Sequence, residues 1–227
     1  MQIKKIFSAL MSGAFKGHFG QYAEDALVRK LFDFKHRKGN YIDLGAYHPF
    51  RFSNTAFFWM RDWQGINVDA NPKTIELFKK TRKKDLNLWA AVITQQEFDS
   101  GTKHINLMLP EKSDRYGLSA IGTVSKEQAE QNGMKTLVSV PTTTINNIFK
   151  KNHIVKLDFL NIDLEGYDEK VILDFDFKFC KPKIIAIEIF SKSVCETTAN
   201  LTVAHIKKQG YRLHAVAGYT AIFVLLD

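Results

Sequence analysis

Acidic side chains recur at the ends of short apolar runs in this sequence, and such positions suit ligand binding or proton transfer. The acids concerned are Asp43, Asp69, Asp163, Glu165 and Glu188. In a parallel sheet the carboxyl ends of neighbouring strands meet at one edge, and ligands bind beyond that edge. If the apolar runs are strands of one sheet, these five carboxyl groups surround one pocket.

The turn after the first apolar run excludes one class of ligand. It reads D-L-G-A-Y-H-P over residues 43–49, with Gly45 as its only glycine. A dinucleotide site needs several glycines, as in G-x-G-x-x-G, so that a pyrophosphate can approach the backbone. An acidic residue followed by a single glycine turn instead suits a cofactor without phosphates. S-adenosylmethionine has that shape and charge.

Asp69 ends the second apolar run and is the second element of this expected cofactor site. A carboxylate at a strand tip can accept hydrogen bonds from both hydroxyls of an adenosine ribose. The alternative is structural, because an Asp before Pro72 also begins an Asx turn. The second acid, Asp43, at the preceding strand tip favours the cofactor.

Asp163 and Glu165 follow a buried-type run at residues 157–162 and are the main candidates for catalysis. They project to the same side if the strand stays extended. Two carboxyl groups buried together raise one pKa, which suits a general base or a divalent metal site. The structural alternative is that Glu165 caps the next helix while Asp163 orders a loop.

Two weaker candidates complete the catalytic set. Glu188 lies within the apolar run at 184–189, where a charge is costly unless it is paired or functional, and it is expected to meet Asp163 and Glu165. These three carboxyl groups are also the candidate metal ligands. His48 is a further candidate, although a single histidine is more often structural.

The elements that position these residues alternate between strands and helices. Strands are predicted at 41–45, 65–69, 86–92, 157–162 and 184–189; helices at about 22–34, 53–60, 72–83 and 196–209; and a closing hairpin at 211–216 and 219–225. Ser53 or Asn54 is expected to cap the second helix, and Pro72 to begin the third. This order predicts an α/β fold with a mostly parallel sheet and helices on both faces.

Two segments stand apart from this alternation. Residues 1–20 are predicted to form an amphipathic helix that packs on its own domain or a second subunit, or that lies on a membrane surface. Residues 21–227 then form one domain. Within it, 96–142 interrupts the alternation, with an antiparallel strand at 105–109, and is a candidate substrate region.

Composition narrows the function further. The 227 residues carry 32 Lys plus Arg and 24 Asp plus Glu, a formal charge of +8. This charge is either a solvated surface or an attraction to anions such as phosphorylated sugars, nucleic acids or acidic lipid heads. No run of 18 apolar residues suits a membrane span. Cys180 and Cys195 are too few for a disulfide framework, so we expect buried or inert thiols and a cytoplasmic location.

An ordered set of motifs resembles the FkbM-type S-adenosylmethionine-dependent methyltransferase family. The motifs are Q-Y-A-E-D at 21–25, Y-I-D-L-G-A at 41–46, S-N-T at 53–55, W-Q-G-I at 63–66, V-D-A-N-P at 68–72 and F-L-N-I-D-L-E-G at 159–166. The resemblance covers about residues 20–190. It implies a class I (Rossmann-like) methyltransferase fold, with a seven-stranded sheet that has one antiparallel strand.

The resemblance also implies roles for individual residues. Asp43, Gly45 and Ala46 would line the methionine end of the cofactor, Asp69 would hold the ribose, Ala90 and Ala91 would lie near the adenine, and Asp163 and Glu165 would lie beside the transferring methyl. Asn54 and Ala70 within these motifs, and Tyr47 directly after one of them, are further expected cofactor contacts.

Members of the family usually methylate hydroxyl groups of sugars, polysaccharides or polyketide-type metabolites. We therefore expect O-methylation of a carbohydrate, such as a nucleotide-activated sugar contacted by Lys103, Lys112 and Arg115, or an unphosphorylated glycan. The absence of an Asn/Asp-Pro-Pro-aromatic motif after the fourth strand favours oxygen over nitrogen as the acceptor. The alternatives are a nucleic-acid methyltransferase and a non-catalytic domain that binds a partner, and a homo-oligomer is compatible with each.

Overall fold

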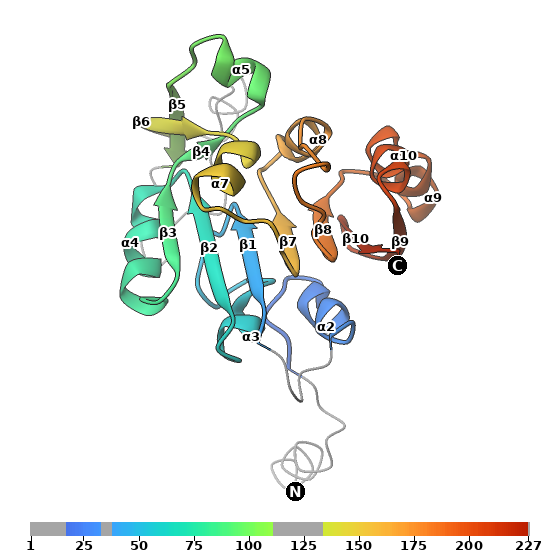
Figure 1. The fold of residues 1–227 in the computed structure, drawn as a ribbon. Helices are drawn as coiled ribbons and strands as arrows, with labels where there is room; N and C mark the ends of the chain where they lie inside the picture. Colours follow the sequence, from blue (N-terminus) through green and yellow to red (C-terminus); the bar gives the residue numbers. More distant parts are fainter. Residues whose placement is uncertain (1–16, 33–37, 111–133, 227) are drawn as a thin grey trace, which may run out of the picture.

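A seven-stranded sheet organises the molecule (Figure 1). The computed structural model describes residues 17–32, 38–110 and 134–226. The strands of the large sheet are β1 (Asn40–Leu44), β2 (Gln64–Asp69), β3 (Leu86–Trp89), β7 (Phe159–Ile162), β8 (Ile184–Glu188), β9 (Tyr211–Ala217) and β10 (Thr220–Leu225). Their order is β3-β2-β1-β7-β8-β10-β9. Only β10 pairs antiparallel with its neighbours, which confirms the predicted mostly parallel sheet with an antiparallel C-terminal strand.

Helices cover both faces of this sheet, as predicted. The helices of the described residues are α2 (Glu24–Arg29), α3 (Ala56–Trp59), α4 (Pro72–Thr81), α5 (Gln95–Asp99), α7 (Ile145–Lys151), α8 (Asp168–Leu173), α9 (Val194–Ala199) and α10 (Leu201–Lys208), of which α5 lies beside the smaller sheet described below. Alternate residues of each strand enter different cores. Ile185 and Ile187 of β8 pack with residues of α7, α8 and α10, whereas Ile184 and Ala186 pack with residues of α2 and α3. Because both faces are covered, the strands need continuous apolar runs.

A second, smaller sheet lies beside the edge of the first. Its strands are β4 (Ala91–Val92), β5 (His104–Pro110) and β6 (Met134–Thr143), in the order β4-β6-β5. β5 pairs antiparallel with β6, which confirms the strand predicted at 105–109. Residues 111–133 of the predicted substrate region, including Lys112 and Arg115, lie outside the described residues.

Three local predictions need correction. The strand predicted at 86–92 divides into β3 and β4, which belong to different sheets. The helix predicted at 196–209 is two helices, because the backbone of Asn200 is extended and its side chain accepts a hydrogen bond from the amide of Thr202 to cap α10. Thr55, rather than Ser53 or Asn54, stands at the start of α3, and it makes no side-chain cap bond there.

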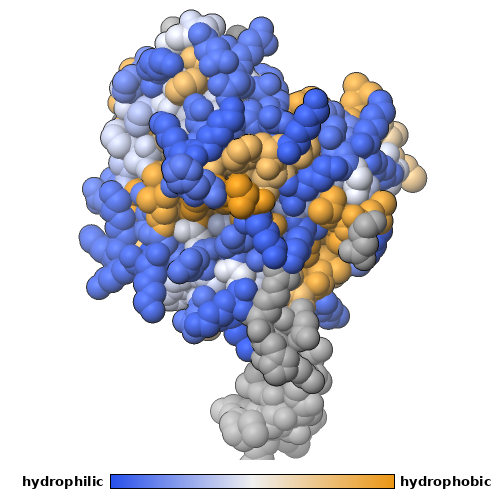
Figure 2. Space-filling model, viewed as in Figure 1, coloured by the Kyte–Doolittle hydropathy of each residue, from blue (hydrophilic) through white to orange (hydrophobic). Residues whose placement is uncertain are grey.

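Two further sequence expectations concern the N-terminus and the surface. Residues 1–16 of the predicted N-terminal helix lie outside the described residues, and 17–20 are not helical. No helix in the described part of the chain is long and apolar enough to span a bilayer. Figure 2 shows a largely hydrophilic face interrupted by apolar patches. Cys180 is buried, as expected, whereas Cys195 is exposed.

Candidate active site

The carboxyl ends of the parallel strands enclose a cavity of about 410 Å³, which we call the strand-tip pocket. Its lining includes every residue predicted to contact the cofactor: Asp43, Gly45, Ala46, Tyr47, Asn54, Asp69, Ala70, Ala90, Ala91 and Asp163. Glu165 and Glu188 also line it. A cavity of this size accommodates a drug-sized ligand. The sheet thus brings together residues that are far apart in the sequence.

The turn after β1 crosses the turn after β7 at Gly45. A Cβ atom built on Gly45 would lie 1.6 Å from the carbonyl oxygen of Asp163, and the φ angle of Gly45 is +79°. Both features require glycine, because a side chain would collide and the left-handed region disfavours other residues. The amides of Gly45 and Ala46 donate to the carbonyl oxygen of Val68, at 2.9 and 3.1 Å, and hold the turn over β2.

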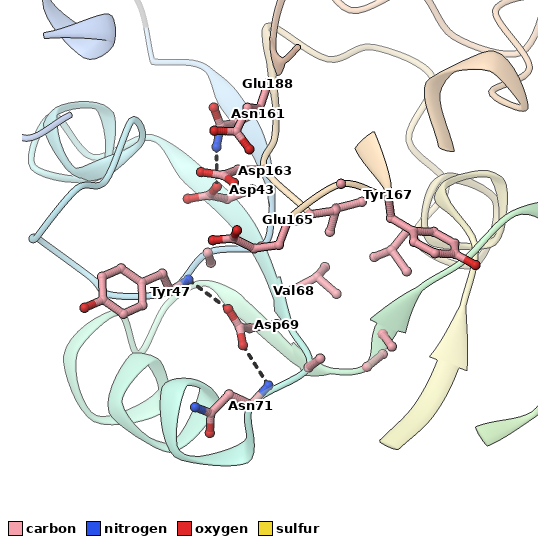
Figure 3. A pocket seen from close by; sticks show the side chains of 18 of the residues that line it. Asp43, Tyr47, Val68, Asp69, Asn71, Asn161, Asp163, Glu165, Tyr167 and Glu188 are labelled. Atoms are coloured by element: carbon pink, nitrogen blue, oxygen red, sulfur yellow. Dashed lines mark hydrogen bonds between the residues drawn. The ribbon is translucent and has the colours of Figure 1, made fainter. Parts of the chain in front are cut away.

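Asp69, at the end of β2, forms the Asx turn that was its structural alternative, and it also lines the pocket. Its Oδ1 accepts a hydrogen bond from the amide of Asn71 at 2.7 Å, as in an Asx turn, and its Oδ2 accepts from the amide of Tyr47 at 2.8 Å. Figure 3 shows both bonds. Burial raises the pKa of Asp69 to about 6 despite these bonds. Each carboxylate oxygen has a second lone pair, so Asp69 retains the capacity to accept from a ligand.

Asp43 is buried, and both oxygens of its carboxylate already accept hydrogen bonds within the protein. Its Oδ2 accepts a hydrogen bond from the hydroxyl of Thr55 at 2.5 Å, and its Oδ1 accepts from the side-chain amide of Asn161 at 2.9 Å. Asn161 in turn accepts from the side-chain amide of Asn54 at 3.1 Å. Burial raises the pKa of Asp43, although Thr55, Arg82 and Asn161 oppose the shift. These bonds fix the strand tips of β1 and β7 relative to the turn before α3.

Arg82 is the main residue that the sequence did not reveal. Its side chain is fully buried at the end of α4, and its guanidinium donates to Tyr41, Thr55, Asn67 and Ser53, and to the backbone carbonyl of Pro49. In the sequence Arg82 lies next to Lys83 and Lys84 and is typical of a solvated charge run. Nothing in its spacing indicates burial. Through Thr55, Arg82 supports the carboxylate of Asp43.

The catalytic candidates form a cluster whose membership differs from the prediction. One carboxylate oxygen each from Asp163, Asp168 and Glu188 lies within 4.8 Å of the other two. Asp168 therefore takes the place that was predicted for Glu165. The reason is that β7 ends at Ile162, and Glu165 has a φ angle of +51°, so the extended chain that the prediction assumed does not continue.

Glu165 nevertheless faces the pocket. In Figure 3 its carboxylate extends between the Asp43 and Asp163 pair and Asp69. The structural alternative for Glu165, that it caps a helix, is wrong, because Asp168 makes the local bonds instead. The Asp168 carboxylate accepts from the amide of Leu164 at 2.7 Å and from the amide of Gly166 at 3.0 Å.

Like charges in this cluster contribute to raising the pKa values of its carboxyl groups. Desolvation and then the charges of Glu188, Asp168 and Glu165 raise the pKa of Asp163 well above its usual range. Desolvation, with Asp168 and Glu165 as the main neighbouring charges, raises the pKa of Glu188 to about 7. A base is most effective when its pKa is near the working pH. Glu188 therefore fits a general base better than its place in the sequence suggested.

His48 lies outside this group. It is buried, and its Nδ1 accepts hydrogen bonds from the amides of Phe50 and Arg51, each at 3.0 Å. His48 is not among the residues that line the strand-tip pocket. Its position supports the structural interpretation and corrects its place among the catalytic candidates.

The remaining wall of the pocket is apolar. Ala90 and Ala91 are buried in it, and Ile105, Leu107 and Leu109 of β5 complete it. At its edge the hydroxyl of Tyr167 donates to Glu97 at 2.5 Å. The described part of 96–142 therefore contributes to the same pocket as the strand tips.

The strand order, the pocket at the carboxyl ends and the acids at the tips of β1 and β2 define a class I methyltransferase fold. More particularly, the chain belongs to the FkbM methyltransferase family, because the family described as "Methyltransferase FkbM domain" matches residues 43–213. The protein is thus a member of a family of S-adenosylmethionine-dependent methyltransferases.

Comparison with solved structures finds a similar chain, a TehB-like SAM-dependent methyltransferase from Corynebacterium glutamicum ATCC 13032 Kitasato. The TM-score is 0.44 and the sequence identity 10%, over 99% of this chain and 97% of that chain. No curated protein sequence matches the chain significantly.

The residues of the strand-tip pocket fit S-adenosylmethionine, the cofactor that the family implies. Gly45 lines the pocket without a side chain, and its crossing with the turn after β7 brings the backbone of both turns to the pocket wall. Asp69 offers acceptors for ribose hydroxyls, and Ala90 and Ala91 offer an apolar surface for adenine. The carboxylates around Asp163 complement a positively charged sulfonium.

Proposed function

We propose that the protein is an O-methyltransferase that acts on a hydroxyl group of a carbohydrate. The observation that carries the proposal is the convergence of Asp163, Asp168 and Glu188 within 4.8 Å, with Asp163 and Glu188 in the lining of the pocket that fits the cofactor. A hydroxyl group is a poor nucleophile at neutral pH and needs a positioned base. A carboxyl group whose pKa is near 7 provides one.

In this proposal Glu188 accepts the proton of the acceptor hydroxyl, and its raised pKa is maintained by desolvation and by the neighbouring charges of Asp168 and Glu165. Glu165 is the alternative base, because its side chain also reaches the pocket. When bound, S-adenosylmethionine supplies a methyl group whose bond to sulfur breaks as the bond to oxygen forms, leaving a neutral thioether. Asp43 and Asp69 hold the turns that align the two reactants, and alignment can contribute about 7–11 kcal/mol.

A divalent metal ion is the alternative means of activating the hydroxyl. The oxygens of Asp163, Asp168 and Glu188 are hard ligands at a suitable spacing for Mg²⁺ or Ca²⁺. Glu165, a predicted ligand, is not part of this group. Sensitivity of the reaction to a chelator distinguishes the metal from the carboxylate base.

The substrate class within carbohydrates follows from weaker observations. The net charge of +8 favours an acceptor that carries phosphate, such as a nucleotide-activated sugar. Lys103 lies against the ring of Phe98, at 3.7 Å, outside the pocket lining, and its contact with the substrate stays a prediction. Lys170 is the cation among the described lining residues.

The test is incubation of the full chain with methyl-labelled S-adenosylmethionine and a panel of nucleotide sugars and glycans, with and without chelator. We expect label on a sugar oxygen, and loss of turnover in Glu188→Gln without loss of cofactor binding. Label on RNA or DNA alone would indicate a nucleic-acid methyltransferase. Failure to bind either S-adenosylmethionine or its demethylated product would indicate a non-catalytic domain.

A further inference from the structure

The strand-tip pocket has a second wall, opposite its apolar wall, that the cofactor contacts leave unassigned. This wall is formed by Tyr22 from the segment before α2 and Glu24 at the start of α2, together with Glu188 of β8 and Thr220 of β10. In the sheet these strands lie on the far side of β7 from β2 and β3. The wall also contains Glu188, the proposed base, so the reacting hydroxyl must lie against it.

Three exposed aromatic rings continue from this wall to the surface, and we call them the aromatic rim: Tyr22, Phe190 and Tyr219. Their exposed fractions are 47%, 57% and 43%. The ring centroids of Tyr22 and Tyr219 are 6.4 Å apart in an edge-on arrangement, and those of Phe190 and Tyr219 are 5.5 Å apart. Exposed apolar groups that adjoin a polar pocket are typical of ligand-binding sites.

The rim is held in place by the backbone. Tyr22 packs directly on Gly218 of the turn between β9 and β10, where a Cβ atom would lie 2.2 Å from the ring. The amide of Tyr22 donates to the carboxylate of Glu24 at 2.8 Å. Tyr219 is held by the hydrogen bond that its carbonyl accepts from Ile189, at 2.8 Å. Tyr22 is thus held in place by contacts with the turn between β9 and β10 and with Glu24.

Hydrogen-bond acceptors lie at the inner end of the rim. Glu24 is 3% exposed and lines the pocket, and Glu188 is half-buried beside Thr220, its partner in the sheet. In residues 17–32, 38–110 and 134–226, no cation lies within salt-bridge distance of either carboxylate. The nine-tenths-buried Asn54 adds a side-chain oxygen that finds no hydrogen-bond partner among the described residues. Such a wall accepts hydrogen bonds from neutral hydroxyls and repels anions.

We propose that the aromatic rim and Glu24 form the acceptor subsite, which binds a neutral pyranose ring. The ring's C–H face stacks on the aromatic rings, whose faces carry partial negative charge, and its hydroxyl groups donate to Glu24 and Glu188. Any phosphate on the acceptor then lies away from the rim. This inference rests on the proposed function and specifies which part of the substrate the site recognises.

The test measures binding of neutral methyl glycosides of glucose, galactose, mannose and rhamnose to the full chain by saturation-transfer NMR. Their 6-phosphate or uronate counterparts, where these exist, are measured in parallel, and S-adenosylhomocysteine is present throughout. We expect at least one neutral glycoside to bind and its charged counterpart to bind more weakly. Tyr22→Ala and Tyr219→Ala should each weaken that binding by about 3- to 10-fold. Phe179→Ala, which removes an exposed ring outside the pocket lining, should leave it unchanged.

Calorimetry with S-adenosylhomocysteine separates failure of the subsite from failure of the proposed function. Normal cofactor-product binding without binding of any glycoside would overturn the subsite alone. Equal glycoside binding by all variants, or preference for the charged sugars, would also overturn the subsite.

A vesicle assay tests the alternative occupant of the rim. If Tyr22→Ala reduces sedimentation with anionic vesicles but leaves glycoside binding unchanged, the rim contacts a lipid surface instead. Loss of S-adenosylhomocysteine binding by the wild-type chain would overturn the proposed function. Glu24→Gln keeps the shape of the wall and checks the hydroxyl contacts if Tyr22→Ala unfolds.

Discussion

At the residue scale, the strand-tip pocket concentrates acids whose titration is shifted upward by burial and by one another. Asp69 has a pKa of about 6 and Glu188 one of about 7, and the pKa of Asp163 is also raised. Each acid gains its charge less readily than in water, because ionisation places like charges close together in a poorly solvated site. A ligand with a positive charge relieves this repulsion, because it stabilises the ionised carboxylates.

The raised pKa of Glu188 predicts the pH dependence of the reaction. A base must be unprotonated, so kcat/KM should rise with pH, reach half of its plateau near pH 7 and fall about tenfold per unit well below that value. In Glu188→Gln the carboxylate is absent, and turnover should fall by about 100-fold or more and lose this dependence. Rates measured from pH 5.5 to 8.5 check both statements. Glu165→Gln serves as the comparison. If Glu165→Gln abolishes the rise of kcat/KM with pH and Glu188→Gln does not, Glu165 is the base.

At the element scale, the pocket depends on two turns whose conformations are fixed by single residues. The turn after β1 passes so close to Asp163 that only Gly45 fits, and the turn before α3 is held by Arg82 through Ser53 and Thr55. The sequence predicts the glycine turn after the first strand, but not its crossing with the turn after β7. The sequence does not predict the buried arginine either, because burial of Arg82 depends on tertiary contacts with residues 15 to 41 positions away.

Gly45→Ala should destabilise the fold strongly. The new methyl group meets a backbone oxygen that cannot move alone, and the left-handed φ adds strain, so we expect a loss of about 3 kcal/mol or more in the free energy of unfolding. Gly101→Ala is a matched control, since Gly101 also has a positive φ, +103°, but nothing lies within 4 Å of its added Cβ. It should cost about 1–2 kcal/mol. Denaturant unfolding of both variants measures the difference, and equal losses would show that the crossing at Gly45 is not tight.

Arg82→Met should reduce both stability and cofactor affinity. It removes the donors to Tyr41, Ser53 and Thr55 from a site without water access, which costs about 3 kcal/mol or more. It also releases Thr55, so the position of the Asp43 carboxylate becomes less defined. Lys80→Met on the exposed side of α4 is the control and should be nearly neutral. Unfolding and S-adenosylhomocysteine titration of the two variants check this, and a neutral Arg82→Met would contradict the role of the buried network.

At the scale of the whole molecule, the sequence predicts the fold well because the central strands β1, β7 and β8 are buried on both faces, and helices such as α4 and α10 on one. The alternation of strands and helices can therefore be recognised in the sequence from the hydrophobic period and the length of each segment. The sequence does not predict the residues at which the strands end. The break at Ala90 depends on the pairing of β4 with β6 of the smaller sheet, and the replacement of Glu165 by Asp168 depends on a left-handed turn. Both follow from contacts between distant elements.

The central claim is that the strand-tip pocket binds S-adenosylmethionine through the carboxylate of Asp69, and titration of S-adenosylhomocysteine by calorimetry tests it most directly. The wild-type chain should bind one equivalent, with affinity that weakens as the pH falls through about 6 and Asp69 becomes protonated. Asp69→Ala should weaken binding at pH 7.5 by about 10- to 100-fold, because hydrogen bonds to a charged acceptor are lost, whereas Glu76→Ala on the exposed face of α4 should not. No binding by the wild type, or equal affinity in Asp69→Ala, would contradict the claim.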